Sequence, residues 1–163
     1  MTIHAIALGI PDTDDLIASG LIAELDADLL SRYPGETING IDVEEFRAAG
    51  GVFVVAEEGD RVVGCGAFRP YGRDTVEIKR MFVRSTHRGH GIGRAILRRL
   101  EDEARQRGFR FAVLETGNRQ PEAIAFYESS GYGRIEPFGP YIGSARSVCF
   151  RKALSRSRNA IHS

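Results

Sequence analysis

A glycine-rich segment, residues 88–93 (Arg-Gly-His-Gly-Ile-Gly), carries the clearest chemical signal in the chain. Glycine weakens both helices and strands, so three glycines at alternate positions indicate positive φ or a close approach to another molecule. A helix is predicted directly after them, and its first amides lack internal partners and lie at the positive end of its dipole. We therefore expect the turn to hold a phosphate or pyrophosphate, with added charge from Arg84, Arg88 and Arg94. A plain tight turn with solvated arginines is the alternative.

The elements around this turn are a strand and a helix. Residues 75–83 are rich in β-branched and apolar side chains, which predicts a strand. Residues 91–107 repeat apolar side chains at helical spacing and end at Gly108, a favoured residue after a helix. Two nucleotide motifs are excluded: the glycine spacing is not that of a dinucleotide fingerprint, and the Gly-Lys-Ser/Thr of a P-loop is absent.

Length and charge limit the class of protein. The 163 residues suffice for one domain with a hydrophobic core, expected over residues 1–154, and residues 155–163 are predicted to be a disordered tail. The formal net charge is zero, which argues against a general nucleic-acid binder. Arginines crowd between residues 80 and 110, and a basic centre suits an anionic cofactor.

Cysteine and histidine usage gives no metal site. Cys65 and Cys149 lie in apolar runs typical of strands, so we expect buried thiols rather than a disulfide or a metal pair. Of the four histidines, only His87 and His90 are close in sequence, and no carboxylate or cysteine joins them. The sequence shows neither a signal-peptide pattern nor an apolar run of membrane-spanning length, so we expect a cytoplasmic protein without a membrane partner.

The remaining elements alternate helices and strands. Strands are predicted at 3–8, 52–57, 62–69, 109–115, 132–135 and 147–151, with helices at about 12–31, 42–49 and 121–129 and a loop at 34–41. A helix joins strand 75–83 to strand 109–115, so these two strands should be parallel in an otherwise hairpin-connected sheet. The predicted class is α+β.

The chain resembles the GNAT (GCN5-related) N-acetyltransferases in its glycine turn and in three further stretches, at residues 77–83, 114–116 and 118–132. Arg88, Gly91 and Gly93 fill the fixed positions of that family's acetyl-CoA motif, after an apolar triplet at 81–83. The run from Asn118 to Tyr132 resembles its tyrosine-bearing helix through these residues: Asn118, Ala123, Ala125, Phe126, Tyr127, Glu128, Gly131 and Tyr132. Residues 33–36 and 137–143 resemble a bacterial, small-molecule subgroup. The resemblance implies the GNAT fold: a mixed, mostly antiparallel sheet with a splayed parallel central strand pair, flanked by helices.

The resemblance also implies a reaction and a cofactor. Members transfer an acetyl group from acetyl-CoA to a primary amine, here that of a small molecule, by direct attack through a tetrahedral intermediate. The residues that it places at the cofactor are Met81, Phe82, Val83, Arg88, Gly89, His90, Gly91, Ile92, Gly93, Arg94, Asn118 and Tyr127. For Asn118, a turn or helix-cap role is the alternative.

Catalytic roles follow from the needs of acetyl transfer. An amine with a pKa of about 10.4 must lose a proton before it attacks, and Glu77 is the candidate base, with Glu115 as a weaker one. The alternatives for Glu77 are a strand glutamate paired with Lys79 or an arginine, and a water chain in its place. Tyr127 is the expected general acid for the leaving thiolate, against a plain packing role. The candidate acceptor-binding residues are Tyr33, Glu36, Tyr71, Glu115 and Tyr141.

Other functions stay open at this level. The acceptor could be a protein lysine or N-terminus, or the chain could be a non-catalytic acyl-CoA-binding regulatory module. An oxidoreductase with an unusual nucleotide turn is a third alternative. Many members of the family dimerise, so a homodimer is an expectation from the resemblance alone.

Overall fold

The computed structural model describes residues 2–7, 50–59 and 61–154. The helices predicted at 12–31 and 42–49, the loop at 34–41, the candidate residues Tyr33 and Glu36, and the tail 155–163 lie outside the described residues.

Seven strands form one mixed sheet in the order β1-β2-β3-β4-β5-β7-β6. Their bounds are Thr2–Ala7 (β1), Val52–Glu58 (β2), Arg61–Pro70 (β3), Thr75–Val83 (β4), Phe111–Gly117 (β5), Gly133–Ile135 (β6) and Ser147–Ala153 (β7). Only the central pair, β4 and β5, is parallel, and every other neighbouring pair is antiparallel. The predicted α+β class with one parallel pair is confirmed.

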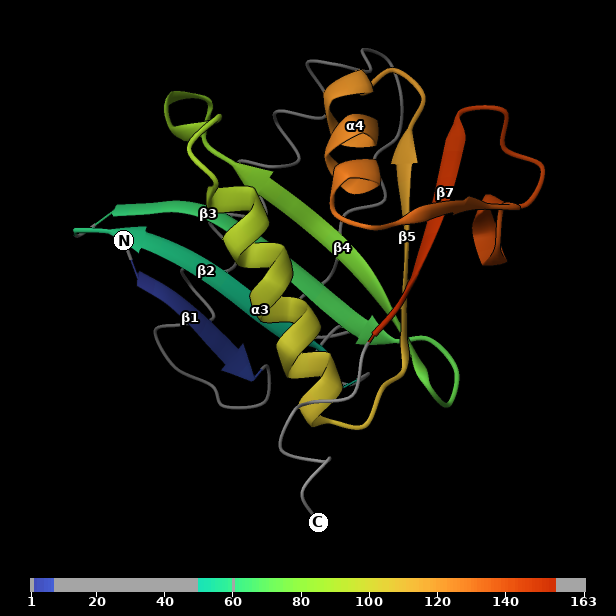
Figure 1. Cartoon of the computed structure of the whole chain (residues 1–163), viewed down its shortest axis with the longest axis horizontal. Helices are drawn as coiled ribbons and strands as arrows, with labels where there is room; N and C mark the ends of the chain where they lie inside the picture. The colour runs from blue at the N-terminus through green and yellow to red at the C-terminus, as the bar shows by residue number, and fades with distance from the viewer. Residues whose placement is uncertain (1, 8–49, 60, 155–163) are drawn as a thin grey trace.

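Two helices, α3 (Ile92–Gln106) and α4 (Pro121–Ser129), lie on one face of the sheet (Figure 1). Two short 3-10 helices, η1 (Ser85–His87) and η2 (Gly139–Tyr141), lie in the loops after β4 and β6. None of the helices described has the length and apolar character needed to span a bilayer.

The predicted boundaries of the described elements agree with the structure to within two residues, and β5 shows the reason for one of these differences. The strand was expected at 109–115 and begins instead at Phe111. The amide of Phe109 still donates to the carbonyl of Ala104 at 3.0 Å, so this residue closes the helix. The Tyr132 amide likewise bonds the Tyr127 carbonyl at 3.1 Å, which delays β6 to Gly133.

Helix α3 packs closely on the sheet because β3 carries glycines beneath it. Ile96 and Leu100 are fully buried against this face. A Cβ atom at Gly66 would lie 2.5 Å from the Met81 sulfur, 2.8 Å from Ile96 and 2.9 Å from Leu100, and a Cβ at Gly64 would lie 3.0 Å from Ile96. Only glycine fits at Gly66 without a shift of its neighbours. Nothing in the local sequence distinguishes either glycine.

The opposite face of the sheet is also buried where β2 to β5 and β7 cross it. By strand alternation, this face carries Phe53, Val55, Cys65, Ala67, Glu77, Val113 and Cys149, all of which are buried. Both cysteines are free and buried, as predicted. Glu77 is the one carboxylate in this set, which makes its partners informative.

Candidate active site

Strands β4 and β5 pair over only the first part of their length. Their parallel ladder runs from Thr75 opposite Phe111 to Ile78 opposite Leu114. Beyond it, residues 79–83 of β4 pair with β3, whereas residues 115–117 of β5 pair with β7. Figure 1 shows the two strands diverging toward their arrowheads, with α4 between them in that view. The inner edges of the parted halves present backbone groups to which the sheet offers no strand partner, and such groups favour an extended ligand.

A bulge lies where β4 leaves β5. Phe82 pairs with Cys65 and Lys79 with Ala67, so Arg80 and Met81 together oppose the single residue Gly66. Arg80 has φ 59°, the only positive φ at a non-glycine residue within the described ranges. A left-handed residue in a strand increases the local twist, and the conformation costs about 1 kcal/mol or more. We attribute the turn of β4 away from β5 to this bulge.

The glycine turn ends at the start of α3. Gly89 (φ 83°) and Gly91 (φ 80°) both have the left-handed conformation, and Gly91 is the N-cap of α3. A Cβ at either position would meet no atom within 4 Å, so space lies in front of this backbone. The first turn of α3 has no acidic residue and no side-chain cap. The N-terminal amides of α3 are therefore presented as a phosphate site requires.

The third glycine differs from the other two in backbone conformation, and its contact with the cofactor stays a prediction. Gly93 lies inside α3 and does not have a positive φ. A Cβ there would lie 3.7 Å from both Phe126 of α4 and Val83 of β4. These are ordinary van der Waals distances, so the packing of α3, β4 and α4 at this point does not itself require a glycine.

Two of the arginines predicted to add charge at the turn, Arg88 and Arg94, also contact other parts of the protein. Arg88 donates from Nε to the Val83 carbonyl at 2.9 Å, and its guanidinium lies 5.9 Å from the centre of the Phe82 ring. Arg94 donates to the Ser129 hydroxyl of α4 at 3.0 Å. These contacts bring the glycine turn, the apolar triplet and α4 together in one place. Ile92 is buried in the core, so only its main chain can face a ligand.

Tyr127 is a residue of α4, and its side chain is buried in the core. Its ring packs against Phe126 at 5.1 Å, Tyr132 at 5.9 Å and Phe150 at 6.2 Å between ring centres. Burial raises the pKa of the Tyr127 hydroxyl, which keeps it protonated at neutral pH. Among the described residues, none hydrogen-bonds to this hydroxyl. The packing role is observed, and the role as general acid stays a prediction.

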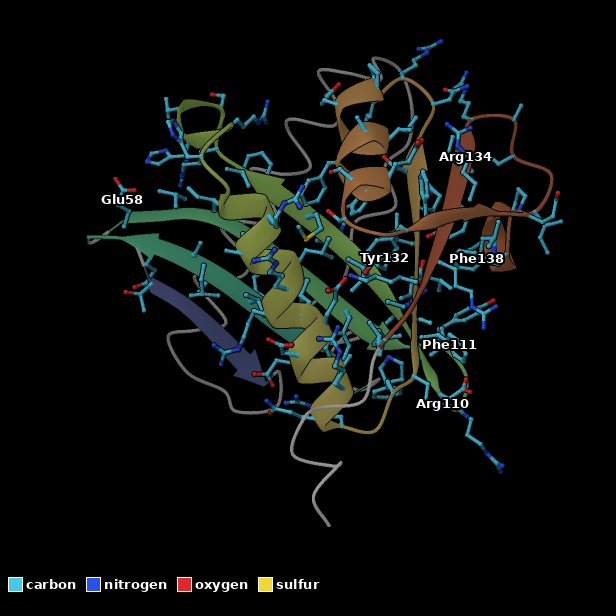
Figure 2. All side chains as sticks on the ribbon, viewed as in Figure 1. Glu58, Arg110, Phe111, Tyr132, Arg134 and Phe138 are labelled. Atoms are coloured by element: carbon cyan, nitrogen blue, oxygen red, sulfur yellow. The ribbon has the colours of Figure 1, made fainter. Side chains whose placement is uncertain are left out.

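Tyr132, which packs against Tyr127, hydrogen-bonds to an ion pair formed by Glu101 and Lys152. The Tyr132 hydroxyl, labelled in Figure 2, donates to Glu101 of α3 at 2.9 Å. Lys152 of β7 donates to both Glu101 oxygens at 3.1 Å and to the Ser130 carbonyl at 3.0 Å. Burial and the Glu101 charge raise the pKa of Tyr132. Glu101 and Lys152 gave no signal in the sequence, because their partners lie 31 and 51 residues away.

Glu77 is fully enclosed by partners. Glu77 as a whole residue is 1% exposed. One of its carboxylate oxygens accepts from both Nε and Nη2 of Arg69, each at 3.1 Å. The other oxygen accepts from the Tyr141 hydroxyl at 2.8 Å and lies 3.8 Å from Lys79 Nζ. This is the paired strand glutamate that the sequence analysis kept as an alternative. The catalytic role of Glu77 stays a prediction.

Lys79 and Glu115 lie on the same face of the sheet, where β4 and β5 part. Lys79 Nζ donates to the Tyr141 hydroxyl at 3.3 Å, and burial lowers the pKa of Lys79, an effect that the Glu77 charge partly opposes. Glu115 directly follows Leu114, the last paired residue of β5. Burial raises the pKa of Glu115, and the charge of Lys79 partly offsets this. Each group therefore favours its neutral form more than it would in water.

Three aromatic rings stand beside these charges. Tyr71 packs on Phe138, and Phe138 on Tyr141, each pair at 5.3 Å between ring centres. Figure 2 shows Phe138 on the loop between β6 and β7, across β5 and β7 from α3. The predicted acceptor residues Tyr71 and Tyr141 are thus brought together, and Tyr141 bonds Glu77. Phe138 was missed, because nothing in its local sequence marks it.

Asn118 behaves as a turn residue in this structure. Its amide donates to the Arg146 carbonyl at 2.8 Å, and its side chain donates to the Ala145 carbonyl at 3.4 Å. These bonds join the end of β5 to the loop before β7. They match the alternative stated for Asn118, and its contact with a cofactor stays a prediction.

Comparison with known proteins agrees with this geometry. The profile of the Acetyltransferase (GNAT) family matches residues 21–132. The chain belongs to the GNAT family. It is therefore an N-acetyltransferase with acetyl-CoA as cosubstrate. The positive-φ glycines before α3 and the parted strands fit that cosubstrate, because they offer free amides for a diphosphate and unpaired strand edges for an extended arm.

Two relatives and one solved structure are similar to this chain over most of their length. The GNAT chain is 42% identical over 139 residues to the IAA acetyltransferase of Azospirillum brasilense, covering 82% of this chain and 88% of the relative. It is 32% identical to the uncharacterized N-acetyltransferase YsnE of Bacillus subtilis, over 86% of this chain and 97% of that protein. A solved structure from Klebsiella pneumoniae, assigned as a candidate acyl-CoA N-acyltransferase, is 32% identical with a TM-score of 0.73, covering 94% and 97% of the two chains.

Proposed function

We propose that this GNAT enzyme acetylates the primary amine of a small molecule by direct attack on acetyl-CoA, through a tetrahedral intermediate. The observation that carries the proposal is the parting of β4 and β5 next to the open start of α3. The amides of residues 89–94 would hold the diphosphate. The main chain of Met81 and Val83 would bond the pantetheine arm, and an amide near Met81 and Phe82 would stabilise the oxyanion.

Glu115 is the base that we propose. It sits at the parting of the strands, burial raises its pKa, and within the described part of the chain no hydrogen bond to its carboxylate is found. Glu77, the base first expected from the sequence, has its oxygens engaged by Arg69 and Tyr141. Both carboxylate oxygens are thus occupied, and an incoming amine would have to displace Arg69 or Tyr141 to reach Glu77. Glu77 is therefore proposed to hold Tyr141 and Lys79 in place.

An acceptor that binds as an ammonium must lose two protons from its nitrogen. Glu115 takes the first and returns it to solvent, which frees the neutral amine to bond the acetyl carbon. When the carbon–sulfur bond breaks, Tyr127 donates its proton to the departing thiolate, and the second proton of the nitrogen replaces the one that Tyr127 has lost. Burial raises the pKa of Tyr127, so the phenol is protonated when that step begins.

Release of free thiol from acetyl-CoA, measured across a panel of amines, tests the function itself. We expect turnover with at least one class of small amine. Turnover with peptides alone would instead support a protein acetyltransferase. Binding of acetyl-CoA without turnover on any amine would support a regulatory module and would contradict the proposal.

The pH dependence of kcat/KM tests the assignment of the base. The rate should rise as the pH increases through the pKa of Glu115, which burial places above the ordinary 4.5. Glu115→Gln should remove this limb and lower turnover by roughly 10²- to 10⁴-fold. Glu77→Gln is the matched control and should keep the limb. A limb lost in Glu77→Gln and retained in Glu115→Gln would restore Glu77 as the base.

A further inference from the structure

The parted ends of β4 and β5 place opposite charges on one face of the sheet. Lys79 projects from β4 and Glu115 from β5, close enough for each charge to shift the pKa of the other. The neighbouring carboxylate, Glu77, already has Arg69 as a charged partner at 3.1 Å. The charge of Glu77 is thus balanced without Lys79, whose Nζ is farther away at 3.8 Å. Lys79 and Glu115 remain as the pair that an acceptor would meet.

The ammonium of Lys79 has more hydrogen-bond donors than the described residues use, so an anion could bind to the others. Its ammonium has three N–H groups, and its side chain is 23% exposed. Within the described ranges, its one hydrogen bond is to the Tyr141 hydroxyl, at 3.3 Å. The Tyr141 hydroxyl in turn donates to Glu77 at 2.8 Å. This bond fixes the position of the hydroxyl that accepts from Lys79. An anion could accept the other donors of Lys79 without disturbing these bonds.

The balance of charge restricts the kind of acceptor. Arg69, Lys79 and Arg80 carry three positive charges, and Glu77 and Glu115 carry two negative ones, so this group is positive by one charge when all are ionised. A polyamine would bring positive charge toward the three cations, and a purely anionic acceptor would bring negative charge toward the two carboxylates. A zwitterion can place its carboxylate at Lys79 and its ammonium at Glu115, so that both charges meet an opposite one.

The aromatic rings of Tyr71, Phe138 and Tyr141 adjoin these charges. The ring of Tyr141 belongs both to this row and, through its hydroxyl, to the charged group. Tyr71, at the far end of the row, is 37% exposed. Exposed aromatic edges and faces bind planar or large apolar groups. A side chain of that kind would lie on the rings while the charged end of the molecule meets Lys79 and Glu115.

We propose that the acetyl acceptor is an α-amino acid with an aromatic or large apolar side chain, and that Lys79 is the specificity residue that binds its carboxylate. This rests on the proposed function and adds the substrate class to it. The ammonium of such an acceptor would face Glu115, the group that takes its proton.

Matched pairs of acceptors, one with and one without the carboxylate, test the proposal. Phenylalanine is compared with phenethylamine, and tyrosine with tyramine, by initial rates of thiol release. The wild type should favour each amino acid over its decarboxylated partner by about 10-fold or more in kcat/KM. Lys79→Met should bring this ratio close to one by slowing the amino acids alone, and Lys79→Arg should restore part of it.

Two further variants separate specificity from general damage. Arg98→Met removes an exposed cation from α3, on the other face of the sheet, and should leave the ratio unchanged. Tyr127→Phe should slow both members of each pair equally. A wild-type ratio near one, or a ratio that Lys79→Met does not alter, overturns the proposal.

Binding measurements separate this proposal from the proposed function. Calorimetry with the CoA-loaded enzyme should show phenylalanine binding more tightly than phenethylamine, with the difference lost in Lys79→Met. If this holds but no amine is acetylated, the amine-acetylation function fails while carboxylate recognition by Lys79 stands. If amines are acetylated but the binding difference is absent, carboxylate recognition fails and the acetylation function stands.

Discussion

The two halves of β4 differ in their strand partners, in their backbone conformation and in the burial of their side chains. The first half, residues 75–78, is paired on both sides, by β3 and by β5, and its Val76 and Ile78 are buried in the core. The second half, residues 79–83, keeps β3 but loses β5, begins with a left-handed Arg80, and has partly exposed side chains. A regular ladder gives stability, whereas an interrupted one leaves backbone groups for a ligand. A single bulge thus divides β4 into a half that is paired on both sides and a half that we propose binds the cosubstrate.

The glycine turn after the open half gives the largest expected effect. Gly91→Ala should weaken acetyl-CoA binding by roughly 100-fold or more, because a Cβ would stand in the open space before the α3 amides. Gly108→Ala is the matched control, since Gly108 has nearly the same φ (86° against 80°), equally open space, and a place at the far end of α3. Both variants bear similar backbone strain, so calorimetry with acetyl-CoA should separate them. Equal affinities would contradict the phosphate site.

Tyr127 lies next to the open half and gives the next effect. Tyr127→Phe should lower kcat by one or more orders of magnitude with little change in acetyl-CoA affinity, because only the proton donor is lost. The ring and its packing on Tyr132 and Phe150 remain, so the thermal midpoint is the control measurement. A parallel fall in affinity and kcat would mark Tyr127 as a packing residue alone.

Gly66, opposite the bulge, links the two halves and gives a smaller effect, on stability and on cofactor binding. Gly66→Ala should lower the free energy of unfolding by about 1–3 kcal/mol, because its Cβ would overlap Met81, Ile96 and Leu100. Displacing Met81 should also weaken acetyl-CoA binding.

A variant in the closed half sharpens this last comparison. Ile78→Val should cost about 0.5–1.5 kcal/mol and leave acetyl-CoA affinity unchanged, since it removes one buried methylene where both neighbours pair. Denaturation and cofactor titration of both variants give the two quantities. Equal effects on affinity would mean that the halves of β4 are not functionally distinct.

The family resemblance and much of the site came from local sequence. The strand at 75–83, the helix at 121–129 and the left-handed glycines 89 and 91 follow from propensity and turn chemistry, which act over a few residues. The parallel pairing of β4 and β5 followed from the helix between them. The same local reasoning also placed Tyr71 and Tyr141 among the acceptor residues, although it could not say what they touch.

Tertiary structure alone decided the charges and the shape of the open half. Arg80 carries no local signal for a left-handed bulge, and Gly66 shows its purpose only when Met81 and α3 lie against it. The sequence neighbours of Glu77 do not show whether its carboxylate is exposed or buried. Its hydrogen-bond partners are Tyr141, 64 residues away, and Arg69 on the adjacent strand. Propensities describe a chain segment in isolation, whereas burial, ionisation and strand parting depend on contacts between segments that the sequence does not bring together.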